Sequence, residues 1–460
     1  MIYRLSIISL SLLLAGCMSL DPDYQRPAAP VPAVWPAQGT QPAATTVLSD
    51  WQHVMTDARL NAVVAKALTS NRDLQEAIAD IESAKALYGE QRASLFPTLD
   101  AELTQTRSRT QDAGVSSTAT ADGAISSFEV DLVGRNRSLS TAAKETWLAS
   151  EFTAQNTRLT LISETSTAWI TLAADNSNLK LAQDTLKNAA DSLRITQRRQ
   201  QEGVASGPDV SSSMAIYQQA RASVASYQTL VAQDINALNL LAGGTVPQNL
   251  LPGTLASLAP QAIALVPAGV SSPVLLRRPD VQEAEHNLKG ANADIGAARA
   301  NFFPTLSLTA SAGVGSSSLS NLFSHGANVW SFAPSLSLPL FTGGSNTAQL
   351  RYAEAQKKGL IAAYEKAIQS AFKDVADALA RRATLSEQMD AQQQYVAAAQ
   401  RSYDLALRSY ETGAGDYLTV LTDQRTLWSA QTDLIALQQT DFENRITLWQ
   451  SLGGGVKEHG

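Results

Sequence analysis

Two blocks of this chain, RASLFPTLDAEL at 92–103 and RANFFPTLSLTA at 299–310, are nearly the same. Aligned without a gap, 73–99 and 280–306 are identical at 13 of 27 positions. Chance does not give such a match, so the chain of 460 residues contains an internal repeat. The repeat predicts that each half of the chain forms the same set of helices and strands.

Each block marks a change from helical to strand periodicity. Helical spacing ends at Ala93, and Pro97 prevents its continuation. Alternation of apolar and polar residues then predicts strands at about 97–108 and 122–133, and at about 304–314 and 328–341 in the second repeat. Segments 109–121 and 315–327, rich in Gly and Ser, are predicted hairpin loops. Simple alternation places one set of residues on a single face of the second strand: Ala124, Ser126, Phe128, Val130 and Leu132.

Very long helices follow each predicted hairpin. No Gly or Pro occurs from Arg135 to Glu202, and only Gly359 interrupts the stretch from Ser345 to Thr412. A helix of that length extends about 100 Å. Each stretch ends in a short turn and continues in a further helix, at about 208–241 and 416–452. Ala-rich helices that are polar on one side are typical of antiparallel coiled coils.

The N-terminus reads as a secretory signal peptide over 1–16, with Arg4 before a short apolar run. Leu14-Ala15-Gly16-Cys17 resembles a bacterial lipobox, and Cys17 is the sole cysteine. We expect Cys17 to become the N-terminus of the mature protein and to carry diacylglycerol and an N-acyl chain. An ordinary signal peptide with an incidental cysteine is the alternative. The remaining segments are a Pro- and Ala-rich linker (17–50), the first repeat (51–242), an inter-repeat segment (243–278), the second repeat (279–452) and a flexible tail (453–460).

Composition argues against several classes of function. The net charge of −7 does not favour a nucleic-acid partner, and the pairs Arg198-Arg199 and Arg381-Arg382 are interpreted as solvated helix faces. The four histidines are scattered without ligand spacing, so no metal site is predicted. No catalytic constellation is recognisable, and we expect no enzyme activity and no cofactor besides the lipid.

The predicted strands require an assembly. A tilted membrane-spanning strand needs about 9–11 residues, which these segments supply. Four strands cannot close a barrel, and an open edge within lipid leaves backbone groups unsatisfied. Two chains would give eight strands, whose own side chains fill the barrel, whereas three chains give twelve and leave room for water. Thr305, Ser307, Thr309 and Ser311 suit a wet lumen and the intervening leucines suit lipid.

Several motifs together resemble one family. They are Leu276-Arg277-Arg278-Pro279-Asp280-Val281 with Ala284-Glu285, Ile295-Gly296-Ala297-Ala298-Arg299-Ala300, Phe302-Phe303-Pro304, Pro339-Leu340-Phe341 with Gly343-Gly344, Tyr417-Leu418 through Gln424-Arg425, and Asp131-Leu132-Val133-Gly134-Arg135. From Cys17 to about Gly454 the chain resembles the outer-membrane factor family, the TolC-like ducts, and within it the OprM/NodT-type efflux lipoproteins.

The resemblance implies a mixed α and transmembrane β fold. A homotrimer would share a 12-stranded outer-membrane β-barrel, four strands per chain, above a periplasmic α-helical coiled-coil barrel. It also implies a lipid-anchored location in the outer membrane of a Gram-negative bacterium. Its expected partners are outer-membrane lipid, a periplasmic adaptor (membrane fusion) protein and an inner-membrane transporter of the resistance–nodulation–division type.

The two tip turns are the candidate functional site. By resemblance we expect the adaptor to dock at Gly203, Gly207 and Asp209 and at Gly413 and Gly415. Asp416, Tyr417 and Leu418 are gate candidates, with Arg408 and Arg425 as possible counter-charges. Three copies of Asp416 around a threefold axis would form an acidic ring. The alternative for Asp416 is an ordinary helix N-cap.

The function expected from these features is the exit channel of a tripartite efflux system for small molecules. A type I secretion duct and a metal-efflux duct remain alternatives within the channel class. A lipid-anchored periplasmic coiled-coil scaffold without a pore is the alternative from another class, although a scaffold would not need the four alternating segments.

Lipidation at Cys17 is directly testable. Cys17→Ser should abolish labelling of the protein by radioactive palmitate, because the sole thiol is then gone. We expect the protein to remain in the membrane, since the strands embed the assembly without the lipid. Labelling that persists in the variant would contradict the assignment.

Overall fold

The computed structural model describes residues 19–35, 50–110, 114–266 and 272–455. Cys17, the signal peptide and residues 36–49 of the predicted linker lie outside the described residues, as does the end of the tail. No helix within the described ranges is both long and apolar enough to cross a bilayer.

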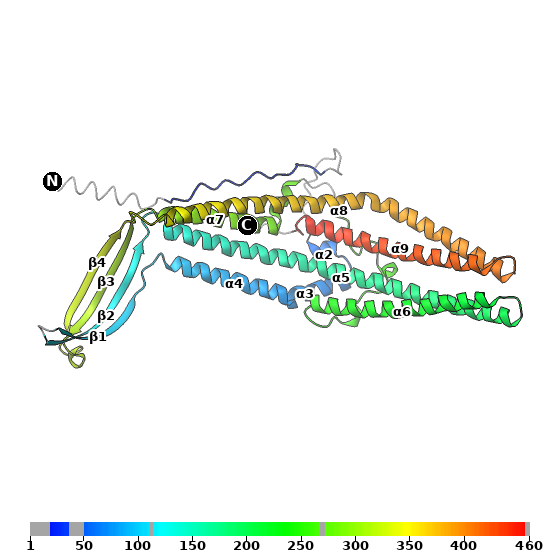
Figure 1. Ribbon diagram of the computed structural model, residues 1–460, viewed down its shortest axis with the longest axis horizontal. Helices are drawn as coiled ribbons and strands as arrows, with labels where there is room; N and C mark the ends of the chain where they lie inside the picture. Colours follow the sequence, from blue (N-terminus) through cyan, green and yellow to red (C-terminus); the bar gives the residue numbers. More distant parts are fainter. Residues whose placement is uncertain (1–18, 36–49, 111–113, 267–271, 456–460) are drawn as a thin grey trace. The chain divides into compact units, whose positions relative to one another are not determined.

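Two successive sets of elements make up the chain (Figure 1). After short helices α2 (Trp51–Val54) and α3 (Ala58–Ser70), the first set is α4 (Arg72–Ala93), β1 (Asp100–Thr110), β2 (Gly114–Val130), α5 (Arg135–Gln201) and α6 (Gly207–Leu241). Three short 3₁₀ helices, η1 (Gln248–Leu250), η2 (Leu255–Ser257) and η3 (Ser272–Arg277), precede the second set. That set is α7 (Pro279–Ala300), β3 (Thr305–Ser316), η4 (Leu319–Asn321), β4 (Ala327–Ser337), α8 (Ser345–Glu411) and α9 (Tyr417–Ser451).

The repeat extends to the lengths of the helices. Helices α4 and α7 each have 22 residues, α5 and α8 each have 67, and α6 and α9 each have 35. A 67-residue helix is about 100 Å long. The structural units cut across the repeats, however. One unit holds the strands with Ala79–Phe152 and Gln282–Lys366, and the other holds Thr153–Val281 and Ala367 onward, so α5 and α8 each contribute to both.

The four strands form one antiparallel sheet in the order β1-β2-β3-β4. The register pairs Leu306 with Leu336 and Ala310 with Phe332, which gives one apolar face. The opposite face carries Thr305, Ser307, Thr309 and Ser311, as predicted, and Ser311 exchanges a 2.9 Å hydrogen bond with Ser331 across the strands. The sheet therefore has the two-sided character that separates an apolar environment from water.

A β-bulge in β2 overturns the predicted face of this strand. Ile125 pairs with Ala310 but Phe128 pairs with Leu308, so β2 contains one residue more than β3 between these two pairs. Ser127, within the bulge, has φ 50°. Because an extra residue inverts the alternation, Ala124 and Phe128 lie on opposite faces rather than on one. The bulge keeps both Ile125 and Phe128 on the apolar face and turns Glu129 to the polar face.

The strand ends also differ from the prediction. β2 begins at Gly114, inside the predicted loop 109–121, because the small and β-branched residues there continue the ladder with β1. β2 ends at Val130 rather than 133, and Asp131 instead accepts a 2.9 Å hydrogen bond from the amide of Arg137. β4 ends at Ser337 rather than 341, since Pro339 has no amide to donate.

Glu285 on α7 joins the N-terminal segment to the helices of the first unit. Its side chain is 2% exposed and accepts a hydrogen bond from Arg26 at 2.9 Å. It also forms an ion pair with Lys289 at 3.1 Å. Burial would raise the pKa of Glu285, but the hydrogen bonds from Lys289 and Arg26 outweigh burial and hold the pKa below its usual value. The extended N-terminal segment is thereby fixed to α7.

Gly296 shows how closely that segment approaches. A Cβ atom at Gly296 would lie 1.7 Å from Oδ1 of Asp21, so only glycine fits. Asp21 in turn accepts a 2.5 Å hydrogen bond from Ser138, and Arg299 donates to the carbonyl oxygen of Leu20 at 3.1 Å.

The inter-repeat segment packs on the helices of the second unit. Trp169 on α5 donates from its indole to the carbonyl oxygen of Leu250 at 3.0 Å, and Arg445 on α9 donates to that of Ile263 at 2.8 Å. An isolated bridge joins Ile263 to Met55. These contacts hold the inter-repeat segment against α5 and α9.

The packing of α5 against α6 depends on pH. Burial, and next the charge of Asp175, raise the pKa of Asp234 to about 6. The folded state therefore binds this proton more tightly than the unfolded state, and the stabilisation present at low pH is lost as the pH rises through about 6.

Asp234→Asn should stabilise the protein above pH 6 because it removes this charge. We expect a gain of roughly 1 kcal/mol in the free energy of unfolding at pH 8, allowing for partial exposure, and little gain at pH 4.5. Thermal unfolding at the two pH values measures it. Asp433→Asn, at an exposed position of α9, is the matched control, and an equal gain in both variants would refute the argument.

Candidate functional site at the helix tips

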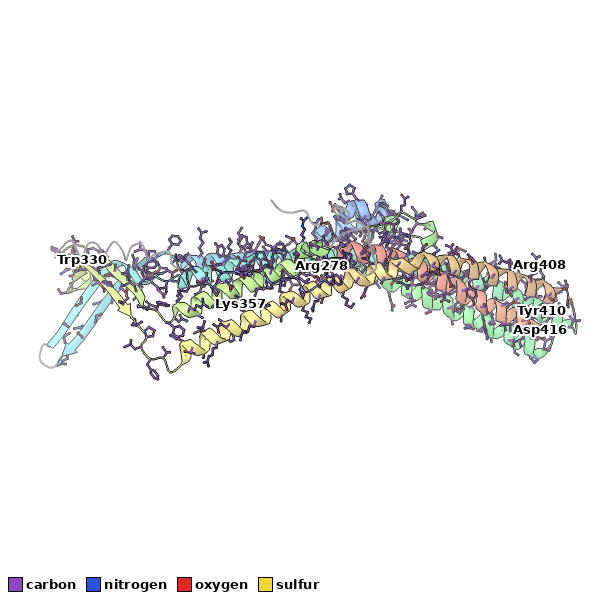
Figure 2. The ribbon with its side chains drawn as sticks, turned by 90° about the horizontal axis from the view of Figure 1, so that it is seen from above. Arg278, Trp330, Lys357, Arg408, Tyr410 and Asp416 are labelled. Carbon is purple, nitrogen blue, oxygen red and sulfur yellow. The ribbon has the colours of Figure 1, made fainter. Side chains whose placement is uncertain are left out.

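The turn from α5 to α6 and the turn from α8 to α9 lie at the same end of the second unit (Figure 1). Arg408, Tyr410 and Asp416 gather there (Figure 2). These turns contain the residues that the sequence nominated for docking and gating.

Both turns use the same backbone solution. Gly203 and Gly413 have φ 81° and 82°, the left-handed conformation that ends a helix. The amide of Val204 donates to Arg199 at 2.8 Å, and the amide of Ala414 donates to Ser409 at 2.9 Å, so each helix closes with a Schellman motif. The repeat thus specifies its turns as well as its helix lengths.

The residues after these glycines start the returning helices. Ser206 and Asp209 form a capping box, and Gly207 and Pro208 occupy the first helical positions of α6. Gly415 lies against α8, where a Cβ atom would be 3.3 Å from the carbonyl carbon of Ser409 and 2.7 Å from its Oγ. Gly207 and Asp209 therefore shape the first turn, and Gly415 the second.

Asp416 is the N-cap of α9. Its carboxylate accepts from the amide of Thr419 at 2.8 Å and from the Thr419 hydroxyl at 2.9 Å. The hydrogen bond from the Thr419 amide, and next the one from the Thr419 hydroxyl, lower the pKa of Asp416. Asp416 is therefore a helix N-cap, which was the alternative interpretation of this residue. An acidic ring of three Asp416 side chains stays a prediction. Arg408 is exposed on α8 and Leu418 is 72% exposed, whereas Tyr417 is 4% exposed.

Arg199 joins the two hairpins at the tip. Its Nη1 donates to the carbonyl oxygens of Tyr410 at 3.0 Å and of Glu411 at 3.3 Å. Its guanidinium also lies 4.5 Å from the centroid of the Tyr410 ring, within cation–π range. The side chain of Arg199, at the end of α5, therefore donates to the last carbonyl oxygens of α8 and stacks on the Tyr410 ring.

Tyr417 extends this contact. Its ring lies 5.0 Å from that of Tyr410, and its hydroxyl shares a 3.0 Å hydrogen bond with Ser192 on α5. Ile216 and Ala220 of α6 belong to the same buried cluster as both tyrosines. We call Arg199, Tyr410, Tyr417 and Ser192 the tip latch.

The interpretation of Arg199 as part of a solvated face is wrong, and so is that of Arg382. Arg198 is exposed and pairs with Glu202 at 3.1 Å, but Arg199 turns inward because the Tyr410 ring and the carbonyl oxygens of Tyr410 and Glu411 are within reach. Arg382 donates to the carbonyl oxygen of Val266. The sequence signal for Arg199 was its place in the last turn of α5, where a cation suits terminal carbonyls.

Comparison with known proteins identifies the architecture. The family model for outer membrane efflux proteins matches residues 63–244 and 270–454, which is most of the chain and covers it as two copies. The chain belongs to the outer membrane efflux protein family. The predicted resemblance, the outer-membrane location and the efflux-channel class are therefore confirmed, and the scaffold without a pore is excluded.

Individual relatives match over nearly their whole length. The antibiotic efflux pump outer membrane protein ArpC of Pseudomonas putida is 42% identical over 467 residues, covering 99% of this chain and 96% of that one. The cation efflux system protein CusC of Escherichia coli is 36% identical over 451 residues, covering 97% and 98%. A crystal structure of a membrane protein from Pseudomonas aeruginosa has a TM-score of 0.87 and 36% identity, covering 95% and 97%.

One of the motifs that carried the resemblance, the one containing Arg278, joins separate segments of the chain. Arg278 binds both oxygens of Asp280, at 3.0 and 2.7 Å, and donates to the carbonyl oxygen of Ser451 at the end of α9 at 2.8 Å. Figure 2 shows Arg278 well away from the tip residues. Such a motif stabilises the fold and identifies the family without contacting the candidate gate.

Arg199→Ala should loosen the tip. It removes a cation–π contact and two hydrogen bonds, about 1–3 kcal/mol per chain. We expect larger single-channel conductance in planar bilayers and increased uptake of a bulky antibiotic. Arg198→Ala is the matched control at the neighbouring position, and equal behaviour of the two variants would show that Arg199 does not hold the tip closed.

Proposed function

We propose that this protein is the exit duct of a tripartite efflux pump and that three copies form it. The observation that carries the proposal is the sheet, which is apolar on one face and polar on the other and has β1 and β4 at its edges. Within the described residues neither edge has a further strand partner. Unpaired edge strands in lipid are costly, so a second copy is the natural partner.

The direction of the strands supports a shared barrel. The four strands alternate in direction, so β4 of one copy and β1 of the next would run antiparallel and continue the ladder. Three copies give twelve strands, enough to leave a water-filled lumen lined by the polar face. The exposed apolar side chains Trp330 and Phe332, 79% and 60% exposed, would then face lipid.

The tip latch is the proposed gate within each chain. It joins the α5–α6 hairpin to the α8–α9 hairpin through the Arg199 guanidinium, the tyrosine rings and the apolar cluster around them, so separating the hairpins means breaking these contacts. An adaptor docked on the turns 203–209 and 413–416 would be placed to supply that force. A covalent lipid on Cys17 would add a second attachment to the outer membrane, with an inner-membrane transporter delivering the substrate.

Small molecules are the proposed substrates. The name of ArpC, an antibiotic efflux protein, supports this class at 42% identity, while CusC, named for cation efflux, is less similar at 36%. A type I secretion duct has no such support from these two relatives.

Resistance and native mass test the proposal together. With its partner pump in a strain lacking its own outer-membrane duct, the chain should restore resistance to toxic small molecules, and the purified particle should have the mass of three chains. Replacing Gly203 and Gly207 by Pro and Glu should abolish resistance without lowering trimer amounts, since these residues shape the docking turn. A particle of one or two chains would refute the shared barrel, and unchanged resistance would place docking elsewhere.

A further inference from the structure

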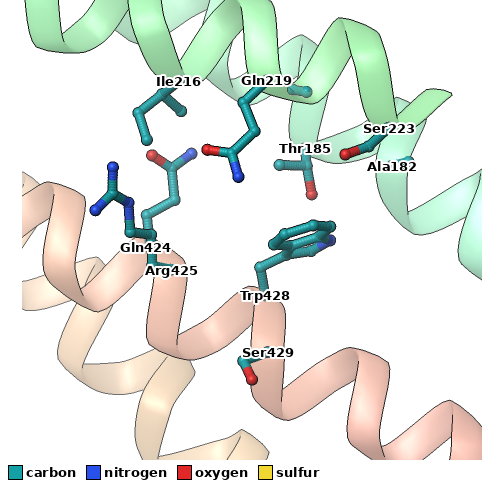
Figure 3. A pocket seen from close by; sticks show the side chains of 10 residues that line it. Ala182, Thr185, Ile216, Gln219, Ser223, Gln424, Arg425, Trp428 and Ser429 are labelled. Carbon is teal, nitrogen blue, oxygen red and sulfur yellow. The ribbon is translucent and has the colours of Figure 1, made fainter. Parts of the chain in front are cut away.

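A cavity lies between α5, α6 and α9, about two to three helical turns from Tyr417 and Ser192 of the tip latch (Figure 3). Its volume is about 290 Å³, near the lower end for ligand pockets and suited to a molecule of one or two rings. Ala182, Ile216 and Ala220 supply aliphatic walls, and the indole of Trp428 supplies a flat aromatic one. The cavity therefore favours a planar apolar body.

Gln424 gives the wall of the cavity a hydrogen-bonding group. The residue is 8% exposed and lines the cavity together with Gln219. In Figure 3 the amide groups of Gln424 and Gln219 both turn into the space between α6 and α9. An amide on the wall of a mostly apolar cavity can donate a hydrogen bond to an acceptor on a ligand.

Arg425 gives the cavity a charge. It is one of the lining residues, is exposed, and has no ion pair with any described residue. No carboxylate lines the cavity to neutralise it. An anionic group on the ligand is therefore complementary to this position.

We propose that this cavity binds aromatic monocarboxylates of one or two rings. The ring system stacks on Trp428 between the aliphatic walls, the carboxylate reaches Arg425, and one of its oxygens accepts a hydrogen bond from the Gln424 amide. Binding in this cavity does not depend on the proposed transport function.

The site is formed jointly by the two hairpins. Ile216 and Ala220 belong to the first hairpin, and Gln424 and Trp428 belong to the second. A ligand that touches both binds the latched arrangement more tightly than a separated one, so it stabilises the closed tip.

Calorimetric titration of the full-length protein in lipid nanodiscs with 2-naphthoate tests the proposal, since detergent could itself fill an apolar cavity. We expect one saturable site per chain with a Kd of about 10–100 µM. Gln424→Leu, which keeps the volume and removes the amide, should weaken binding about tenfold, and Trp428→Ala should abolish it.

The charge is tested separately with a neutral probe. Arg425→Gln should weaken 2-naphthoate about tenfold and leave 2-naphthamide unchanged. Arg401→Gln, an exposed arginine of α8 outside the cavity, is the control and should leave both affinities as they are. Absence of a saturable site in the wild-type protein, or affinities that do not respond to Gln424→Leu and Arg425→Gln, would overturn the proposal.

Discussion

The equal lengths of the paired helices are the constraint on which the tip depends. Because α5 and α8 have the same number of residues, and α6 and α9 likewise, both hairpins can turn at corresponding positions with the same Schellman geometry. Only then does the last turn of α5 lie beside the last turn of α8, where Arg199 finds the carbonyls of Tyr410 and Glu411. Duplication of one unit supplies this match directly, since two copies of a sequence begin with identical lengths.

Much of the architecture could be predicted because it rests on periodicity and punctuation. The repeat, the four strands and the helices free of Gly and Pro all leave patterns over many residues. The bulge at Ser127 could not be predicted, because one extra residue changes the face of a strand without changing its composition. The raised pKa of Asp234 depends first on burial and next on the charge of Asp175 from another helix, and no local pattern records either.

The candidate site likewise contains some features that a local sequence pattern predicts and others that depend on tertiary contacts. The turn glycines and the cap residue Asp416 are local devices, and the sequence located them correctly. Arg199 was misread because its partners are backbone carbonyls at the end of another helix, and a carbonyl carries no residue identity in the sequence. Gln424 and Arg425 appeared among the family motifs, yet their shared position at a cavity follows only from the packing of α6 on α9.

The bulge in β2 also has a consequence for how this sheet can change over time. A gain or loss of one residue between Ser127 and the hairpin end would exchange the apolar and polar sides of everything beyond it, so single-residue length changes there disrupt the two-sided sheet. The connection between β1 and β2 lies beyond the last ladder pair, Thr110 with Gly114, and bears no such parity. Length variation in this hairpin should therefore accumulate at the connection, leaving the strand itself constant in length.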